Sequence, residues 1–207
     1  MRLISITQIF KDIKMKYHGL PFSKTGWDLH MMPIGYLMIE HRLIERMIKL
    51  INGQLNRIDR ENKADLVFID TAIDFIRAYA DKCHHGKEED ILFERLSKKP
   101  LIPEHKKAMQ MLLEEHKMGR LAVGKLIDAK DKYSQGNSGS LKAIRRHLKW
   151  LVEFYPEHIA KEDKGFFIPS MQYFSKQEQD SMLIDFCKFD GPEIQQVYRK
   201  IVQGLEA

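Results

Sequence analysis

The chain has 207 residues, of which 43% are hydrophobic and 30% are charged, and its formal net charge is +5. These values are ordinary for a soluble globular protein, and a small positive charge spread along the chain does not indicate nucleic-acid binding. The length suits one domain with its own core, so we expect a single domain over residues 1–207.

Export, membrane insertion and disulfide bonding are all unexpected for this sequence. It shows no secretory leader and no run of about 18 apolar residues that could span a bilayer. Only two cysteines, Cys83 and Cys187, are present, which is too few for a disulfide framework in a chain of this size. We therefore expect a cytoplasmic protein with reduced thiols and with neither a nucleic-acid nor a membrane partner.

Apolar residues recur three and four apart between a few Gly and Pro clusters, which predicts an all-α protein. The first thirty residues are less regular and are expected to form an irregular N-terminal segment. Two short helices are expected after residue 169, one opened by the capping-box pattern from Ser175 to Glu178 and one opened near Asp190. The long helices are expected at about residues 33–55, 62–97, 103–133 and 140–168.

Four long helices with short connections predict an antiparallel up-down-up-down four-helix bundle, with its core at residues 33–169. The apolar stripe of each helix contains at least one histidine, and one from each helix is expected in the site: His41, His85, His116 and His158. Counted from the end of the bundle that the helices share, at roughly 1.5 Å per residue, the four heights agree to within about 8 Å. The sequence therefore predicts a single layer of inward-facing histidines.

Two glutamates accompany these histidines at helical spacing. Glu89 lies four residues after His85, and Glu162 lies four residues after His158, so each pair projects from one face of its helix. A site of four His and two Glu suits a pair of iron ions, with manganese as a second metal, whereas structural zinc sites more often use Cys. Buried carboxylates also need cations that neutralise their charge.

The second helix leaves an alternative open. His84 and Glu88 are also four residues apart, rotated by about 100° from the pair His85 and Glu89. The apolar stripe that continues through Leu92 favours His85 and Glu89 as ligands. His84 remains an alternative, either as a ligand or as a group that supports one.

At this point the residues resemble the hemerythrin-like, or HHE cation-binding, family over about residues 33–168. The segments that carry the resemblance are LMIEHRLIE, CHHGKEEDILF, LLEEHKMGR and HIAKEDKGFF. The resemblance implies an antiparallel four-helix bundle that holds a non-haem di-iron centre, in which two carboxylates bridge the irons.

One departure from the oxygen-carrying members concerns the third helix. Those proteins bear two histidines four apart there, but Leu112 and Arg120 stand four residues before and after His116. The chain is more similar to bacterial di-iron proteins of nitric oxide resistance and iron-sulfur repair, although it lacks their N-terminal cysteine-bearing domain. Asp163 stands where oxygen carriers place their bridging carboxylate, but helix rotation favours Glu162.

The function expected from this resemblance is the binding of, or reaction with, a small diatomic ligand, O2 or NO, in sensing or storage. The alternatives are a di-iron enzyme or iron donor that acts in nitrosative or oxidative stress, and a metal that merely staples the bundle. Glu40 and Glu115 are interpreted as solvated flanks, with a proton path or support of the ligands as the alternative, and Cys83 as a buried spectator, with a redox-active thiol as the alternative. Gly86 and Gly119 are expected to provide room for a ligand channel or for close helix approach.

Overall fold

The computed structural model describes residues 32–190 and 193–207, and these residues form helices and short connections, with no strand among them. The prediction of an all-α protein is confirmed. The expected irregular N-terminal segment, and the residues 191–192 expected to open the last helix, lie outside the described residues.

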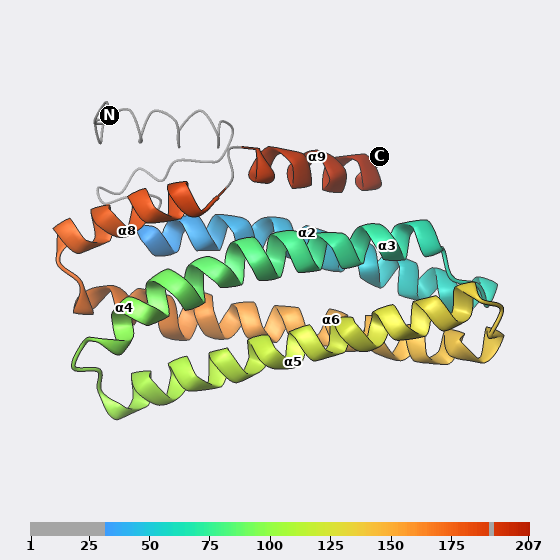
Figure 1. Ribbon diagram of the computed structural model, residues 1–207, viewed down its shortest axis with the longest axis horizontal. Helices are drawn as coiled ribbons and strands as arrows, with labels where there is room; N and C mark the ends of the chain where they lie inside the picture. Colours follow the sequence, from blue (N-terminus) through green and yellow to red (C-terminus); the bar gives the residue numbers. More distant parts are fainter. Residues whose placement is uncertain (1–31, 191–192) are drawn as a thin grey trace.

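Four long helical segments lie side by side along the long axis of the molecule, and successive segments are joined at alternating ends (Figure 1). The second is one continuous helix made of an α-helical start, two π-helical segments and a short α-helical end. The elements in chain order are α2 (Pro33–Glu61), α3 (Leu66–Asp74), η2 (Phe75–His85), η3 (Glu88–Phe93), α4 (Glu94–Ser97), α5 (Pro103–Ser134) and α6 (Leu141–Lys161).

The first helix begins where the sequence predicts and ends later. Pro33 occupies its first turn, where a missing N–H and a fixed φ are tolerated. At the other end Asn62 adopts a left-handed conformation, and its N–H donates to the Ile58 carbonyl. The helix passes the predicted end near residue 55 because Leu55 and Ile58 are buried in the core, which outweighs the weak helix formers Asn52, Gly53 and Asn56.

The second helix departs from α-helical geometry next to the histidines. A π-helix closes i to i+5 hydrogen bonds and so has more residues per turn than an α-helix. In η2 the neighbours His84 and His85 are both buried, and in η3 Glu88 is fully buried while Glu89 is partly exposed. The 3.6-residue period used to read the sequence therefore does not apply across this stretch.

The chain after α6 turns back over the bundle. It continues through η5 (Glu162–Phe166), α7 (Phe167–Ser170) and η6 (Met171–Tyr173). Next, α8 (Lys176–Phe189) begins with the predicted capping box, in which Ser175 and Glu178 each bond the backbone N–H of the other. Finally, α9 (Ile194–Glu206) contacts α2 and η2.

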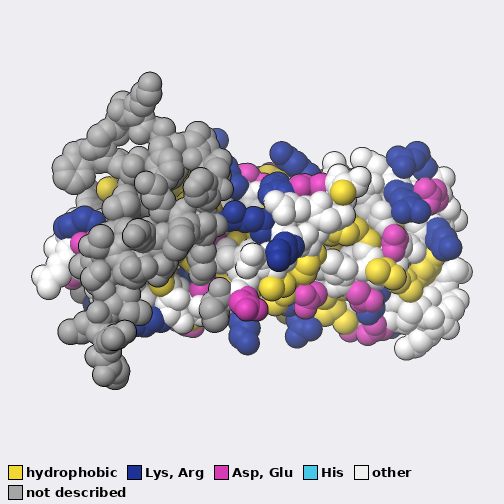
Figure 2. All heavy atoms as spheres, turned by 90° about the horizontal axis from the view of Figure 1, so that it is seen from above, with side chains coloured by type: hydrophobic (Ala, Val, Ile, Leu, Met, Phe, Trp, Pro, Cys, Tyr) yellow, Lys and Arg dark blue, Asp and Glu magenta, His cyan; other side chains and the backbone are white. Residues whose placement is uncertain are grey.

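Helices α8 and α9 lie on the α2 side of the molecule (Figure 1). The visible part of this face carries interspersed acidic and basic side chains (Figure 2). Among the described residues, no helix has both the length and the apolar character that a membrane span would need.

The buried apolar side chains form two clusters with a polar layer between them. One cluster contains Ile44, Leu126 and Leu148, and the other contains Leu37 and Leu112. Along each long helical segment, the buried histidines fall between residues of one cluster and residues of the other. The apolar clusters thus fix a polar layer across the middle of the bundle.

Candidate metal centre

The polar layer brings buried histidines from all four long segments together. His41 comes from α2, His84 and His85 come from the end of η2, His116 comes from α5, and His158 comes from α6. The predicted layer of His41, His85, His116 and His158 is therefore present, and His84 joins it. The π-helical turn explains the extra residue, because it directs two neighbouring side chains inward.

The Glu88 carboxylate lies between two of these rings. Its Oε1 is 3.2 Å from His84 Nε2, and its Oε2 is 3.3 Å from His116 Nε2. Glu88 is fully buried, and neither of its oxygens accepts a hydrogen bond. A carboxylate placed in this way faces one histidine with each oxygen.

The Glu162 carboxylate is placed in the same way from the opposite side of the layer. Its Oε2 is 3.2 Å from His41 Nε2, and its Oε1 is 3.3 Å from His158 Nε2 and 3.6 Å from His116 Nε2. Glu162 is also fully buried and accepts no hydrogen bond. The two glutamates therefore span from one set of histidines to the other, as carboxylates that bridge two cations would.

The side chains fall into two groups whose ligand atoms lie within 4.8 Å of one another, a spacing that suits a metal ion in each group. The first group is His41, His84, Glu88 and Glu162, and the second is His85, His116 and His158. Imidazole nitrogens and carboxylate oxygens without thiolate form a donor set that suits iron or manganese.

The strongest evidence that this layer suits cations is the set of side-chain atoms that lack a hydrogen-bond partner. Among the described residues, every buried side-chain nitrogen or oxygen without a partner belongs to this layer. Each such atom costs about 1–3 kcal/mol if nothing satisfies it. The atoms are Nε2 of His41, His84, His116 and His158 and both carboxylate oxygens of Glu88 and Glu162. The residues present therefore fit a pair of metal ions.

The other ring nitrogen of each histidine is held by a carboxylate. His41 Nδ1 pairs with Asp163 Oδ1 at 2.7 Å, and Asp163 also pairs with Arg42. His84 Nδ1 pairs with Glu40 Oε2 at 2.8 Å. A carboxylate that accepts from Nδ1–H fixes the tautomer and the ring orientation, so that Nε2 is free to bind a metal.

The same arrangement recurs on the other side of the layer. His116 Nδ1 pairs with Glu89 Oε1 at 2.7 Å, and Arg120 Nη2 donates to the same oxygen at 2.7 Å. His158 Nδ1 pairs with Glu115 Oε2 at 2.8 Å. We conclude that these acidic residues orient the imidazoles rather than face a shared cation.

The predicted bridging role of Glu89 does not match its position. Its carboxylate lies on the outside of the His116 ring, is 23% exposed and is absent from both metal-binding groups. Glu88 occupies the place between the histidines instead, because the π-helical turn shifts the inward-facing position by one residue. The alternative pair His84 and Glu88 therefore lies in the layer, as Glu162 does.

His85 occupies the edge of the layer. Its ring stacks on the His116 ring, with centroids 3.9 Å apart, and its Nδ1 is 3.4 Å from Asp81 Oδ1. It belongs to the second group, but its Nε2 is not among the buried atoms that lack a partner. Of the predicted ligands, His85 is thus placed beside His116 and His158 at the edge of the layer.

A cavity of about 270 Å³ opens beside His85 and His116. Gly119, Arg120 and Tyr155 also line it, and a Cβ added at Gly119 would meet only the Phe154 ring, at 3.7 Å. The expectation of space near Gly119 therefore matches a cavity that reaches the layer.

Gly86 allows two helices to approach closely, which is the second role expected for these glycines. A Cβ added there would lie 2.7 Å from the ring of Phe189. Gly86 thus allows the end of α8 to approach the second helix closely.

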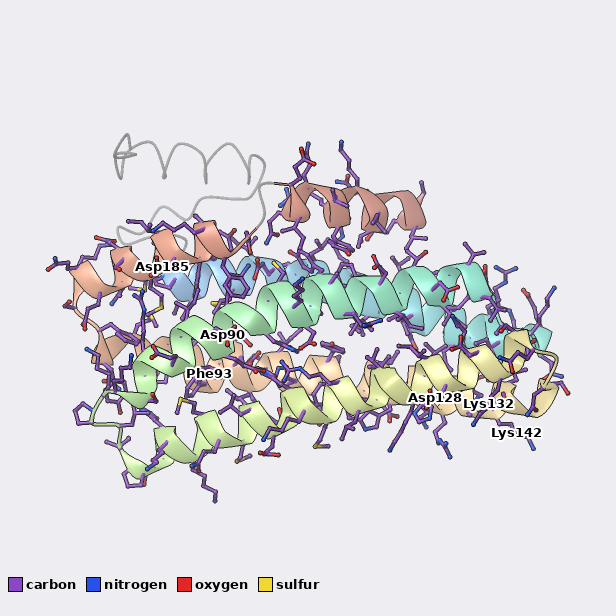
Figure 3. All side chains as sticks on the ribbon, in the orientation of Figure 1. Asp90, Phe93, Asp128, Lys132, Lys142 and Asp185 are labelled. Carbon is purple, nitrogen blue, oxygen red and sulfur yellow. The ribbon has the colours of Figure 1, made fainter. Side chains whose placement is uncertain are left out.

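Phenylalanine rings lie flat against three of the histidines. Phe167 stacks on His41 with centroids 5.6 Å apart, and Phe154 stacks on His158 at 5.3 Å. Phe93, labelled in Figure 3, lies between the second helix and α5 and stacks over His116 at 6.1 Å. These rings restrict the imidazoles and keep water from the adjoining apolar clusters.

The layer carries unusual electrostatics. Burial lowers the pKa of His84, but Glu88 and Glu40 raise it more, to about 10. Burial also lowers the pKa of His116, but the carboxylates around its ring raise this pKa more, to about 9. For Glu162, burial raises the pKa, but the histidines around it bring the pKa well below its usual value. An ionised carboxylate at this depth favours a cation.

Comparison with known proteins now adds to the geometry. A family model described as the hemerythrin HHE cation binding domain matches residues 32–168. The chain belongs to the hemerythrin HHE family. Searches of curated proteins and of solved structures found no match. The matched range includes every residue of this hemerythrin-like layer and ends before α8 and α9.

Proposed function

We propose that this hemerythrin-family protein binds two iron ions between Glu88 and Glu162, in the middle of an antiparallel up-down-up-down four-helix bundle. Manganese is a second metal that the same donors suit. The observation that carries the proposal is the set of eight buried atoms without hydrogen-bond partners, all of which face the space between the two glutamates.

The proposed ligands divide into two unequal sets. His41 and His84 serve one ion, and His116 and His158, with His85 at the edge, serve the other. Under this assignment the second helix supplies a histidine that oxygen-carrying hemerythrins place on the third helix. The total of five histidines and two carboxylates then resembles the oxygen carriers more than the four-histidine repair proteins.

We further propose that the iron pair binds a small diatomic ligand, O2 or NO. When bound, a ferrous pair supplies electrons and open coordination positions to such a molecule. The chain contributes a means of access, because a cavity lined by His85 and His116 lies beside the layer. The apolar clusters on both sides of the layer keep bulk water out.

Anaerobic iron loading followed by rapid mixing tests this function. We expect two irons per chain by metal analysis, and an optical band that forms with O2 or NO and disappears when the gas is removed. Rapid conversion to a ferric product with repeated turnover would instead support an enzyme that reduces NO or peroxide, or an iron donor. Bound iron that never reacts would leave only a structural staple.

A further inference from the structure

A buried polar cluster lies on the Nδ1 side of His84, away from the proposed metal pair. It joins α2 and the second helix to the C-terminal segment, and all of its members are at most 4% exposed. We call it the Glu40 network, and its members are Glu40, Cys83, Lys87, Asp190 and Gln195.

The Glu40 carboxylate is held by donors from two directions. Its Oε2 accepts from His84 Nδ1 at 2.8 Å. Its Oε1 accepts from Lys87 Nζ at 2.5 Å and from the side-chain amide of Gln195. Gln195 lies in the first turn of α9, so the last helix reaches the carboxylate that orients a proposed metal ligand.

Asp190, the residue that caps the C-terminus of α8, also accepts hydrogen bonds from Lys87 and Gln195, the two residues that donate to Glu40 Oε1. It accepts from the Lys87 ammonium and, at 2.8 Å, from Gln195 Nε2. The hydroxyl of Tyr36 also donates to it, at 2.5 Å. Two carboxylates and one ammonium leave one net negative charge behind His84, which favours a cation on its other side.

The carboxylate that orients His84 is more deeply buried than the carboxylate that orients His41. Asp163, which pairs with His41, is 11% exposed, and its cation Arg42 is 51% exposed. Water can replace a partner lost at such a site. Glu40 is fully buried, so an atom that loses its partner there stays unsatisfied.

We propose that Asp190 and Gln195 are positioning residues of the metal centre: they hold Glu40 so that His84 presents Nε2 to the ion beside His41. This inference rests on the proposed function. Both residues lie beyond the range 32–168 that the family model matches. The end of α8 and the start of α9 therefore add support, from outside the matched range, to a site whose proposed ligands all lie within it.

A purely structural attachment of α9 does not require these contacts. Tyr198 of α9 donates a hydrogen bond to Asp74 at 2.9 Å, and Arg46 of α2 pairs with Glu206 near the end of α9. Neither contact reaches Glu40. Tyr198→Phe is therefore a matched control, because it removes one α9 hydrogen bond without changing the Glu40 network.

The test compares Gln195→Leu with Tyr198→Phe in the full chain. Each is titrated anaerobically with Fe²⁺ against a competing chelator, and the ⁵⁷Fe-loaded protein is examined by Mössbauer spectroscopy. We expect Gln195→Leu to weaken one of the two irons by about 10- to 100-fold, the effect typical of groups that orient metal ligands. Only one of the two iron signals should change, and Tyr198→Phe should match the wild type.

Several outcomes would overturn the inference. If Gln195→Leu binds both irons as the wild type does, or weakens both equally, the network does not position His84. If Gln195→Leu does not fold, the nearly isosteric Asp190→Asn is judged by the same two readouts. A wild type that takes up no iron would overturn the proposed function as well, whereas a wild type with two irons and an unaffected variant overturns only this inference.

Discussion

Two adjacent residues, Glu88 and Glu89, have separate roles in the layer. Glu88 lies between His84 and His116 with both oxygens unsatisfied, while Glu89 orients His116 from outside. We predict that Glu88→Gln lowers iron affinity by at least about 100-fold, because it removes a charge shared by both ions, and that Glu89→Gln lowers it by only about 10-fold. Chelator competition measures both, and a larger loss in Glu89→Gln would refute the assignment.

Gly119 gives a second prediction about a single residue. Replacing it with Val should fill part of the cavity beside His116 and Tyr155, and the added Cβ meets only the Phe154 ring. We expect the iron content to stay at two per chain and the rate of O2 or NO binding to fall by at least about 10-fold, since a misfit of one methylene is typically worth this much in a pocket and Val adds three carbon atoms. Gly53→Val, which lies in α2 away from this cavity and has open space around an added Cβ, is the control. Equal rates in wild type and Gly119→Val would exclude this route.

The residues that the sequence predicts well are those on regular α-helices. His41, His116 and His158 could be found because the 3.6-residue period holds in α2, α5 and α6. His84 and Glu88 could not be preferred, since the π-helical turn changes the period where they lie.

The orienting carboxylates were missed for another reason. Glu40 is next to His41 but pairs with His84, and Glu115 is next to His116 but pairs with His158. Each glutamate orients a histidine on a neighbouring helix. The residue spacing within one helix cannot predict a contact between two helices. The acidic residue directly before His41 and the one directly before His116 are the signal that could have indicated them.

At the scale of elements, Lys87 ties the second helix to α2 and the end of α8. Its buried ammonium contacts both Glu40 and Asp190. We predict that Lys87→Met lowers the free energy of unfolding by about 3–5 kcal/mol, because two buried carboxylates lose their cation. Lys161→Met, which removes a half-exposed partner of Glu115, should cost within about 1 kcal/mol. Urea unfolding measures both losses in the free energy of unfolding. Equal losses in the two variants would contradict a stabilising role of the buried Lys87 ammonium.

Helix boundaries were predicted where a local signal sets them. Pro33, Pro103 and the capping box at Ser175 mark helix starts in the sequence, and the structure has them there. The end of α2 was predicted too early because long-range burial of Ile58 decides it. The covering of His84 by α8 and α9 was not predicted, since Asp190 and Gln195 carry no local pattern that points to Glu40.

For the whole molecule, metal binding should depend on pH. The pKa of His84 is raised to about 10 and that of His116 to about 9, so both rings carry a proton at pH 7 before a cation binds. Binding must release these protons, and affinity should therefore rise with pH below about 9. We expect an increase of about tenfold per pH unit for each proton released, measured by chelator competition between pH 6 and 8. A flat profile would contradict the protonation states.

Metal loading should also stabilise the whole fold, because ions bound only by the folded chain shift the unfolding equilibrium. Removing iron with a chelator should lower the melting temperature, and Glu88→Gln, which binds iron more weakly, should show a smaller difference between the iron-loaded and iron-free protein. If the melting temperature of the wild type does not change when iron is bound, this would contradict a metal centre that links all four helical segments.

The central claim is that two cations lie between Glu88 and Glu162. An iron-edge anomalous difference map from crystals of the iron-loaded protein tests it most directly. We predict two peaks, each within bonding distance of one oxygen of both glutamates, with His41 and His84 at one peak and His116 and His158 at the other. A single peak, or iron bound away from this layer, would contradict the account.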